Sequence, residues 1–300
     1  MNIIGKKNIY FLISLLVLIP GLISLWIYGL KLSIDFTGGT RLEYQLQDKV
    51  AQIAPDVLRK SIEQEQIAVA SIQLSGADRV IVRTKPLDQK SHQRLVAKLS
   101  SQFVNLKEVS IETVGPTIGG ETRTNAVKAV FIASIIIVLY VAWSFRKVPK
   151  PASSIRFGIC AIIALLHDLL VVVGIFSLLG HFYGVEVDTL FVTAILTVLG
   201  FSVHDTIVVF DRIRENLRRM PGIKFDQIVN DSIVQTLGRS LNTSLTTILV
   251  LFTLFLFGGE SIKWFVVALL LGITSGTYSS IFNAAPLLVV WEEWSSRKIK

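Results

Sequence analysis

The chain has 300 residues, of which 51% are hydrophobic, and its mean hydropathy is +0.59. This composition is too apolar for an ordinary soluble domain and is typical of an integral membrane protein. A net charge of +8 would suggest nucleic acid in a soluble protein, but membrane topology accounts for many of the basic residues, and we expect no nucleic-acid partner. The only cysteine, Cys160, excludes an intrachain disulfide and a thiolate metal cluster.

Six apolar segments are long enough to cross about 30 Å of hydrocarbon as helices. They cover residues 9–29, 126–145, 157–179, 189–210, 241–257 and 264–291. The first follows two lysines but is too long for the apolar core of a signal peptide, and no A-x-A cleavage site follows it. We therefore expect a retained anchor within residues 1–30 and a five-helix transmembrane bundle within residues 124–300.

Lysine and arginine are distributed unevenly between the loops. They gather before the first span, in the loops 146–156 and 212–239, and after residue 296. The alternate loops, 181–188 and 258–263, contain only Lys263 between them. Because short cytoplasmic loops are enriched in basic residues, this pattern predicts that both termini face the cytoplasm and that residues 31–123 lie outside.

The predicted external domain, residues 31–123, alternates between strand and helix patterns. Strands are expected at 40–47, 68–75, 78–85 and 107–114, helices at 55–66 and 88–103, and a turn at Gly76. The order βαββαβ is that of a ferredoxin-like α+β domain. Since this fold specifies no function and the segment has no P-loop or metal-ligand spacing, we expect a surface that pairs with a polypeptide or another domain.

Glycine-rich motifs flank the external domain, DFTGGT before it and VGPTIGGE after it. Paired glycines permit positive φ and close backbone approach, and proline stiffens the chain. Two ordinary turns would have the same composition, so a hinge at each end is a hypothesis. The predicted hinge residues are Asp35, Gly38, Gly39, Gly115, Pro116 and Gly119.

Ionisable residues inside the spans indicate function. Asp205 lies five residues from the cytoplasmic end of the fourth span, about 8 Å along a helix, and needs a partner or a proton there. Arg239 enters the fifth span from the same side. The further candidates for an ion path are His204, Asp168, His167, Thr243 and Thr247. The alternative for Asp205 is a static ion pair or hydrogen bond that serves assembly only, and either histidine could be neutral and satisfied by a backbone carbonyl.

The polar residues follow helical spacing. Thr193, Thr197, Gly200 and His204 share one face of the fourth span, with Asp205 at its margin, and rows of small residues recur in the sixth span. The residues expected to allow close helix packing are Gly200, Gly272, Gly276, Ser279 and Ser280. We therefore expect a polar seam between the fourth, fifth and sixth spans.

Residues 225–237 have an amphipathic pattern between the fourth and fifth spans. The apolar positions recur at helical spacing, and acidic and amide side chains occupy the other faces. The pattern favours a helix lying on the membrane surface, or a docking helix for a cytoplasmic partner.

Five motifs in order, DFTGGT, VGPTIGGE, GFSVHDTIVVFDRIREN, QTLGRSLNTSLTT and GTYSSIFNAAP, closely resemble those of SecF, the protein-export membrane subunit of the SecD/SecF family in the RND superfamily. The resemblance covers nearly the whole chain. It implies a multi-pass subunit of the bacterial inner membrane that pairs with SecD and assists the Sec translocon channel. The family's role is to couple the proton motive force to late steps of preprotein translocation. The resemblance assigns ion coupling to Asp205 and Arg239.

Two alternatives remain from sequence. The chain could be half of a proton-driven RND-type exporter of small molecules or lipids, or a purely structural subunit that stabilises the translocon. An enzyme is the least expected class, because there is no HExxH and no G-x-S-x-G motif. We expect no cofactor, membrane lipids around the spans, secreted preproteins at the external domain, and either H⁺ or Na⁺ as coupling ion.

Overall fold

The computed structural model describes residues 1–46, 55–75, 79–103, 106–146, 148–149 and 153–297. It divides into two compact units, a sheet unit, Leu32–Val127, and a helical unit formed by Met1–Lys31 with Lys128–Lys300. The sequence placed this division at residues 31–123 and 124–300. The predicted turn at Gly76, the predicted strand ends Gln47 and Asp78, and parts of the basic loop 146–156 and of the C-terminus lie outside the described residues.

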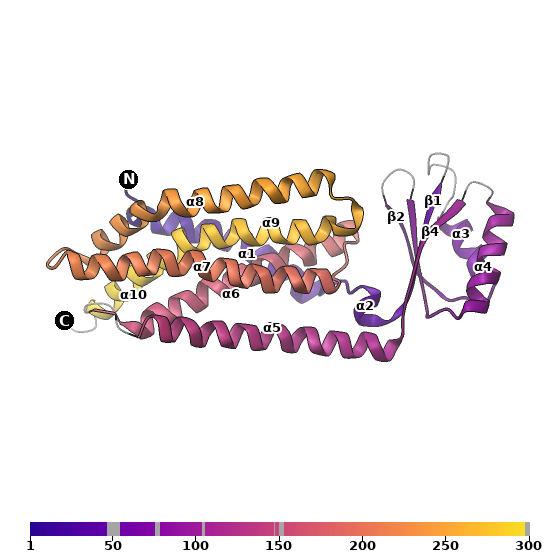
Figure 1. Ribbon diagram of the computed structural model, residues 1–300, viewed down its shortest axis with the longest axis horizontal. Helices are drawn as coiled ribbons and strands as arrows, with labels where there is room; N and C mark the ends of the chain where they lie inside the picture. Colours follow the sequence, from indigo (N-terminus) through magenta and orange to yellow (C-terminus); the bar gives the residue numbers. More distant parts are fainter. Residues whose placement is uncertain (47–54, 76–78, 104–105, 147, 150–152, 298–300) are drawn as a thin grey trace. The chain divides into compact units, whose positions relative to one another are not determined.

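Among the described residues, six helices are long and apolar enough to cross a membrane, as the sequence predicts. They are α1 (Lys7–Tyr28), α5 (Pro116–Ser144), α6 (Ser154–Tyr183), α7 (Thr189–Arg219), α8 (Phe225–Phe257), and α9 (Glu260–Ser279) continued by η3 (Ser280–Ala284) and α10 (Ala285–Arg297). Within the helical unit, α6, α7, α8 and α9 run alongside one another (Figure 1). The chain is therefore a multi-pass membrane protein.

The fifth and sixth spans differ from the expected helices. Residues 225–237 are the first part of α8, so the expected separate surface helix is wrong. The helix continues through Gly238, since an isolated glycine is tolerated inside a helix. The apolar side of residues 225–237 is buried, with Ile228 and Val229 at most 3% exposed. The sixth span contains a π-helical turn, η3, which apolar periodicity does not signal.

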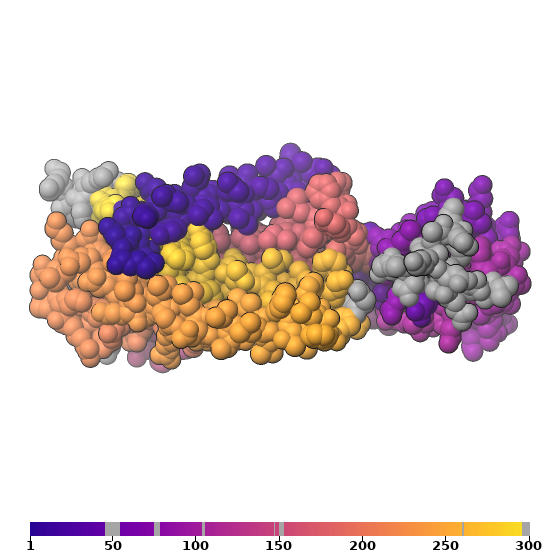
Figure 2. Space-filling view, turned by 90° about the horizontal axis from the view of Figure 1, so that it is seen from above, coloured from indigo at the N-terminus to yellow at the C-terminus, as the bar shows by residue number. Residues whose placement is uncertain are grey.

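The N-terminal segment covers the apolar side of α8. The short 3₁₀ turn η1 (Ile4–Lys6) precedes α1, and the backbone N–H groups of Ile3 and Ile4 donate to Asn230 Oδ1 at 2.8 and 3.4 Å. Asn230 Nδ2 donates in turn to the Met1 carbonyl at 3.0 Å. Figure 2 shows this indigo segment against the orange surface at one end of the helical unit. Ile3 is fully buried as a result.

Close contacts hold the helical unit together. A Cβ added at Gly21 of α1 would lie 2.9 Å from Gly174 Cα of α6, so the two backbones touch. At the other end of α6, the rings of Phe145, Phe157 and Phe210 pack with centroids 5.0 to 5.8 Å apart. That cluster connects Phe145, the residue after α5, to α6 and α7. In the most apolar stretch of α5 itself, only 6% of the residues are buried.

In its described residues the sheet unit has four strands, β1 (Gly39–Leu46), β2 (Val69–Ser75), β3 (Arg79–Thr84) and β4 (Leu106–Val114). Its helices are α2 (Ile34–Thr37), α3 (Pro55–Glu63), α4 (Gln89–Gln102) and the start of α5. From β1 to β4 the order is βαββαβ, as predicted. The strands pair antiparallel in the order β2-β3-β1-β4. Alternate residues of β3, including Val80 and Val82, face a core shared with Leu58 of α3 and Leu95 of α4.

The opposite face of the sheet is polar. Arg79 of β3 forms an ion pair with Glu43 of β1 at 2.7 Å, and Arg83 Nη1 donates to Gln73 Oε1 of β2 at 2.9 Å. Charged pairs at a surface contribute little stability individually. This face is therefore a polar surface whose ion pairs add little to the stability of the fold.

The two glycine motifs pack against each other within the sheet unit. Gly38 has a φ of +71°, and a Cβ added to it would lie 2.7 Å from Pro116 Cα. A Cβ at Gly119 would lie 2.7 Å from Gly38 N, whereas a Cβ at Gly115 or Gly120 would meet nothing within 4 Å. The segment before Gly38 is fixed by Ser33, whose hydroxyl accepts from Asp35 N at 3.2 Å. The motifs thus form one junction of touching backbones.

We expect Gly119→Ala to destabilise this junction, because the added methyl group meets backbone that has to move, at a cost of about 1–3 kcal/mol. The matched control is Gly120→Ala on the next residue of the same helix, where the space is open and alanine is the better helix former by about 1 kcal/mol. Hydrogen exchange of the β1 and β4 amides in the full chain measures the difference. Equal protection in the two variants would contradict the close contact.

Candidate intramembrane ion site

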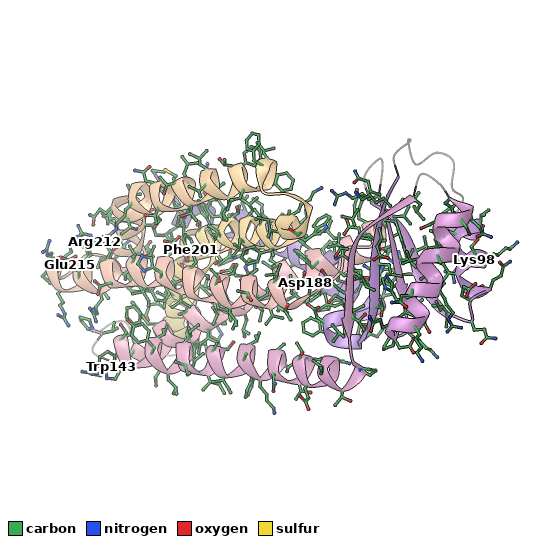
Figure 3. The ribbon with its side chains drawn as sticks, turned by 45° about the vertical axis from the view of Figure 1, so that its right-hand side comes forward. Lys98, Trp143, Asp188, Phe201, Arg212 and Glu215 are labelled. Carbon is green, nitrogen blue, oxygen red and sulfur yellow. The ribbon has the colours of Figure 1, made fainter. Side chains whose placement is uncertain are left out.

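α7 crosses the whole helical unit and carries two of the candidate residues, His204 and Asp205. Its start is fixed by Asp188, whose carboxylate accepts from Phe191 N at 2.8 Å, the usual N-cap arrangement. Arg212 and Glu215 form an ion pair at 2.6 Å near its other end, and Figure 3 shows these residues and Asp188 at opposite ends of the helix. Asp205 lies between them.

Asp205 is 2% exposed and lies where α7, α8 and α9 meet. Its Oδ2 accepts from Ser244 Oγ of α8 at 3.4 Å and from Thr277 Oγ1 of α9 at 3.2 Å. These hydroxyls also bond to each other at 2.5 Å, and each has a carbonyl of its own helix as a further acceptor at 2.9 Å. The carboxylate is therefore loosely held, by long bonds from hydroxyls that have other acceptors.

Arg239 does not pair with this carboxylate. In the described part of the chain no hydrogen bond or ion pair joins its side chain to Asp205, and the residue is exposed on α8. It lies five residues before Ser244, about 7.5 Å along the helix. The seam between α7, α8 and α9 exists as the sequence predicts, but hydroxyl groups occupy the place expected for the guanidinium.

The polar face of α7 points out of the helical unit. Thr193, Thr197, Gly200 and His204 are all exposed, although the sequence placed them toward the fifth and sixth spans. On α8, Thr243 is also exposed and Thr247 is partly buried, and each hydroxyl bonds to the carbonyl four residues before it at 3.0 Å. We call the exposed residues the outward stripe; its members are Thr193, Thr197, Gly200, His204, Arg239, Asn242 and Thr243.

Asp168 is the second buried carboxylate, at 1% exposure midway along α6. Its partners are His167 and three serines, of which Ser202 belongs to α7 and Ser275 and Ser279 to α9. The structure therefore holds two separate carboxylate centres. Asp168 and His167, grouped by sequence with the Asp205 path, belong to a junction of α6, α7 and α9.

Small residues of α9 and η3 allow α6, α7 and α9 to pack closely. Of the five small residues predicted to do so, all but Gly200 of α7 lie in such contacts. A Cβ at Gly272 would collide with the Val198 side chain, and a Cβ at Gly276 would lie 3.0 Å from Ser202 Cβ. Ser279 and Ser280 are fully buried, and Ser280 Oγ bonds to Thr206 Oγ1 at 2.8 Å. Gly200 is exposed and a Cβ there would meet nothing within 4 Å, so it does not pack between these helices.

Sequence reasoning missed Thr277, Ser202 and Thr206 as polar partners. A signal was available for two of them, because Ser202 and Thr206 lie within one turn of Asp205 and are small polar residues in an apolar run. Nothing in the sequence shows that Ser202 turns to Asp168 instead. Among the described residues, no group of three or more His, Cys, Asp or Glu side chains could hold a metal ion.

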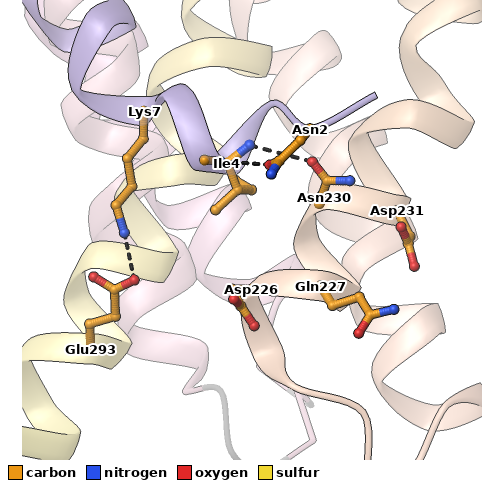
Figure 4. Close-up of a pocket in the computed structure, with 9 residues that line it drawn as sticks. Asn2, Ile4, Lys7, Asp226, Gln227, Asn230, Asp231 and Glu293 are labelled. Carbon is orange, nitrogen blue, oxygen red and sulfur yellow. Dashed lines mark hydrogen bonds and ion pairs between the residues drawn. The ribbon is translucent and has the colours of Figure 1, made fainter.

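A pocket of about 580 Å³ lies apart from both carboxylates, between the N-terminal segment and the start of α8. Figure 4 shows Asn230 at its edge, bonded to Ile4, and Lys7 paired with Glu293 at 2.5 Å. Asp226 and Asp231 of α8 also line it. The contacts around this pocket fix the N-terminal segment to α8 and α10.

The sequence of the chain matches a known family of membrane proteins. Residues 95–294 match the family described as protein export membrane protein SecD/SecF, C-terminal, and residues 23–50 match the SecD/SecF GG motif. A curated relative named protein translocase subunit SecF, from Thermobaculum terrenum, is 50% identical over 97% of this chain and 94% of its own length. One named protein translocase subunit SecDF, from Bacillus subtilis, is 35% identical over 99% of this chain but only 38% of its own length.

Two solved structures agree with these matches. A crystal structure of SecDF from Thermus thermophilus, described as a translocon-associated membrane protein, is 34% identical with a TM-score of 0.85 over 98% of this chain and 39% of its own. A SecDF structure in a super-membrane-facing form is 32% identical with a TM-score of 0.70 over 99% of this chain and 39% of its own. The fold and the buried polar residues define an integral membrane protein with an α+β domain. The chain belongs to the SecD/SecF family of protein-export membrane proteins.

We expect Thr277→Val to lower the free energy of unfolding by about 1–3 kcal/mol, because it keeps the side-chain volume and removes a donor to a buried carboxylate. The matched control is Thr274→Val, one turn earlier on α9, whose exposed hydroxyl bonds only to the carbonyl of its own helix. That change should stay within about 0.5 kcal/mol. Denaturant unfolding of the purified chain measures both, and equal values would contradict a donor role for Thr277.

Proposed function

We propose that this chain is an auxiliary subunit of the bacterial Sec protein-export machinery, which pairs with SecD and couples the ion motive force to late steps of preprotein translocation. The observation that carries the coupling role is the loosely held carboxylate of Asp205, buried in a span and bonded by two hydroxyls at 3.2 and 3.4 Å. An acid that served assembly alone would be expected to have short bonds from committed donors. The role is that of a transport subunit without an enzyme site or cofactor.

The coupling step follows from what can neutralise Asp205. A proton on the carboxyl and the approach of the Arg239 guanidinium are alternative ways to remove the cost of a buried negative charge. Ser244 and Thr277 can release the carboxylate once a proton or the guanidinium replaces their hydrogen bonds to it, because each hydroxyl has a carbonyl acceptor of its own. One charge moved through 100 mV supplies about 2.3 kcal/mol, which shifts a two-state equilibrium about 50-fold. Thr243, Thr247 and His204 would line the outer side of this path.

Pairing with SecD is supported by the outward stripe. Polar and charged side chains that face hydrocarbon are costly, so a row of them on α7 and α8 favours a protein partner at that surface. The chain also spans only 38% and 39% of the SecDF proteins that it matches, and those single chains are long enough to include a second, larger part. We propose that SecD covers the outward stripe and supplies the acidic group that faces Arg239.

We propose that the sheet unit is a ferredoxin-like domain outside the membrane and that it meets the emerging preprotein. Its antiparallel order β2-β3-β1-β4 and the βαββαβ sequence support the domain type. The unequal distribution of Lys and Arg supports an inner-membrane location with both termini in the cytoplasm. Because Gly38 and Gly119 are in close backbone contact, a shift of the spans would move the sheet unit as one rigid body.

We expect Asp205→Asn to insert and to copurify with SecD but to lose ion-gradient-dependent export, because the amide is similar in shape and carries no proton or charge to exchange. Export of a preprotein into vesicles with an imposed ΔpH or ΔNa⁺ measures this and identifies the ion. Asp226→Asn on the exposed start of α8 is the matched control and should export normally. Unchanged export in Asp205→Asn would exclude the coupling role, and loss of SecD binding would favour a purely structural subunit.

We expect Thr197→Trp to abolish copurification with SecD, because an indole in the middle of the outward stripe would separate the two proteins. Leu12→Trp on α1, where the leucine is 63% exposed, is the control that adds similar bulk to an apolar surface and should leave copurification unchanged. Normal copurification of both variants would exclude the outward stripe as the interface. Copurification with the translocon channel separates this assembly from a small-molecule or lipid exporter.

A further inference from the structure

Asp168 is surrounded by short hydrogen bonds from three serines. Its Oδ2 accepts from Ser202 Oγ at 2.5 Å and from Ser279 Oγ at 2.6 Å. Its Oδ1 accepts from Ser275 Oγ at 2.8 Å and faces His167 Nδ1 at 3.0 Å. Three hydroxyls thus donate to the two oxygens, and His167 Nδ1 donates a fourth hydrogen bond in the tautomer that carries its hydrogen there.

The negative charge of this centre needs a countercharge. The lysine and arginine side chains of the described residues form no hydrogen bond or ion pair with Asp168, and Arg156 on the same helix pairs with Glu292 of α10. A lone charge deep in a span is costly. The imidazole of His167, already in contact through Nδ1, can supply the positive charge by binding a proton at Nε2.

The surroundings of Nε2 accommodate both protonation states. Nε2 lies 3.4 Å from Asn283 Nδ2, which donates to it when the imidazole is neutral. Rotating the Asn283 amide by half a turn would present Oδ1, which accepts from a protonated Nε2–H. Ser14 Oγ of α1 lies 2.7 Å from Asn283 Nδ2 and 2.9 Å from Oδ1, and a hydroxyl can donate or accept. Neither state leaves a polar group without a partner.

The backbone around Asn283 supports such a rearrangement. Asn283 lies in the π turn η3, Ser280–Ala284, a widened helical geometry that is frequent at functional sites. The His167 side chain is 12% exposed and that of Asp168 is 1% exposed, so the histidine is the more accessible member of the pair.

Other titratable groups on the neighbouring helices are engaged elsewhere. Asp205 of α7 bonds to α8 and α9, and the hydroxyl of Tyr278 on α9 donates to the carbonyl of Tyr10 on α1 at 2.8 Å. His204 of α7 is in the outward stripe. In the described residues none of these side chains bonds to His167 or Asp168, so the pair forms a centre separate from them.

We propose that His167 and Asp168 form a second proton-binding site, with the proton on His167 Nε2, the carboxylate held ionised by three serines, and Asn283 reporting the state to α1. The step is proton binding alone: a lone pair of Nε2 takes up the proton and no covalent bond breaks. Proton occupancy changes the charge at the junction of α6, α7 and α9 by one unit. The site rests on the proposed function for its role in coupling, but its chemistry requires neither SecD nor export.

The test uses histidine ¹⁵N resonances of the full chain in lipid bilayers. The chain has four histidines, so replacing His92, His181 and His204 one at a time with Gln assigns the remaining signal to His167 without altering it. We expect the His167 signals to change from a neutral to a protonated imidazole as the pH is lowered. A His167 that stays neutral wherever the fold is intact would overturn the proposal.

Two substitutions, Asp168→Asn and Asn283→Leu, separate the pair from an independent histidine, and Asp205→Asn is the control. Asp168→Asn should abolish the protonated signal of His167, whereas Asp205→Asn should leave it unchanged. Asn283→Leu, which keeps Asp168, should reduce the protonated fraction at acidic pH, because the acceptor for Nε2–H is lost. The same response in all variants would refute the dyad. An unchanged export rate in Asp205→Asn, with His167 still responding, would overturn the coupling role of Asp205 and leave this site standing.

Discussion

A carboxylate inside hydrocarbon has to be supplied with hydrogen-bond donors by the protein itself, since no water reaches it. Serine and threonine meet this requirement, because a hydroxyl satisfies itself on its own helix until a neighbour comes within reach. The rest of the helical unit follows from the need to bring those hydroxyls close. Gly276 allows Ser202 of α7 to come within reach of Asp168, and Gly21 and Gly174 allow α1 to lie against α6.

The same constraint is met in two different ways. Around Asp168 the donors are short and come from α7 and α9, so three helices are tied to one side chain. Around Asp205 the bonds exceed 3.1 Å and the hydroxyls have other acceptors. Charge-assisted hydrogen bonds are roughly twice as strong as neutral ones when their geometry is short and direct. The junction of α6, α7 and α9 is therefore the firmer part, and α8, which carries Arg239, is held to Asp205 by the weaker bonds.

Much of the fold was predictable from the sequence because it depends on one-dimensional patterns. Apolar length fixed the six spans, and alternation with turn residues fixed the βαββαβ order of the sheet unit. Asp205 was identifiable as a candidate because an acid in a span is costly wherever its partners lie. The direction of a polar face was not predictable, since periodicity says which residues share a side of a helix but not which neighbour that side meets. Thr197 and His204 were therefore placed inward although they lie on the outward stripe.

The π turn and the Asn230 contact illustrate a second limit. The Asn230 contact joins residues more than 200 positions apart, and the π turn is a local change in helical pitch. Neither leaves a periodic signal in the sequence. Their consequence is nevertheless mechanical. Asn230 fixes the N-terminal segment to α8, while Asn283 in the π turn connects α1 to the junction of α6, α7 and α9. The N-terminal segment is thus attached to α8, and α1 is attached in its middle to the junction of α6, α7 and α9, so a shift of α8 relative to that junction has to change the contacts of one or the other.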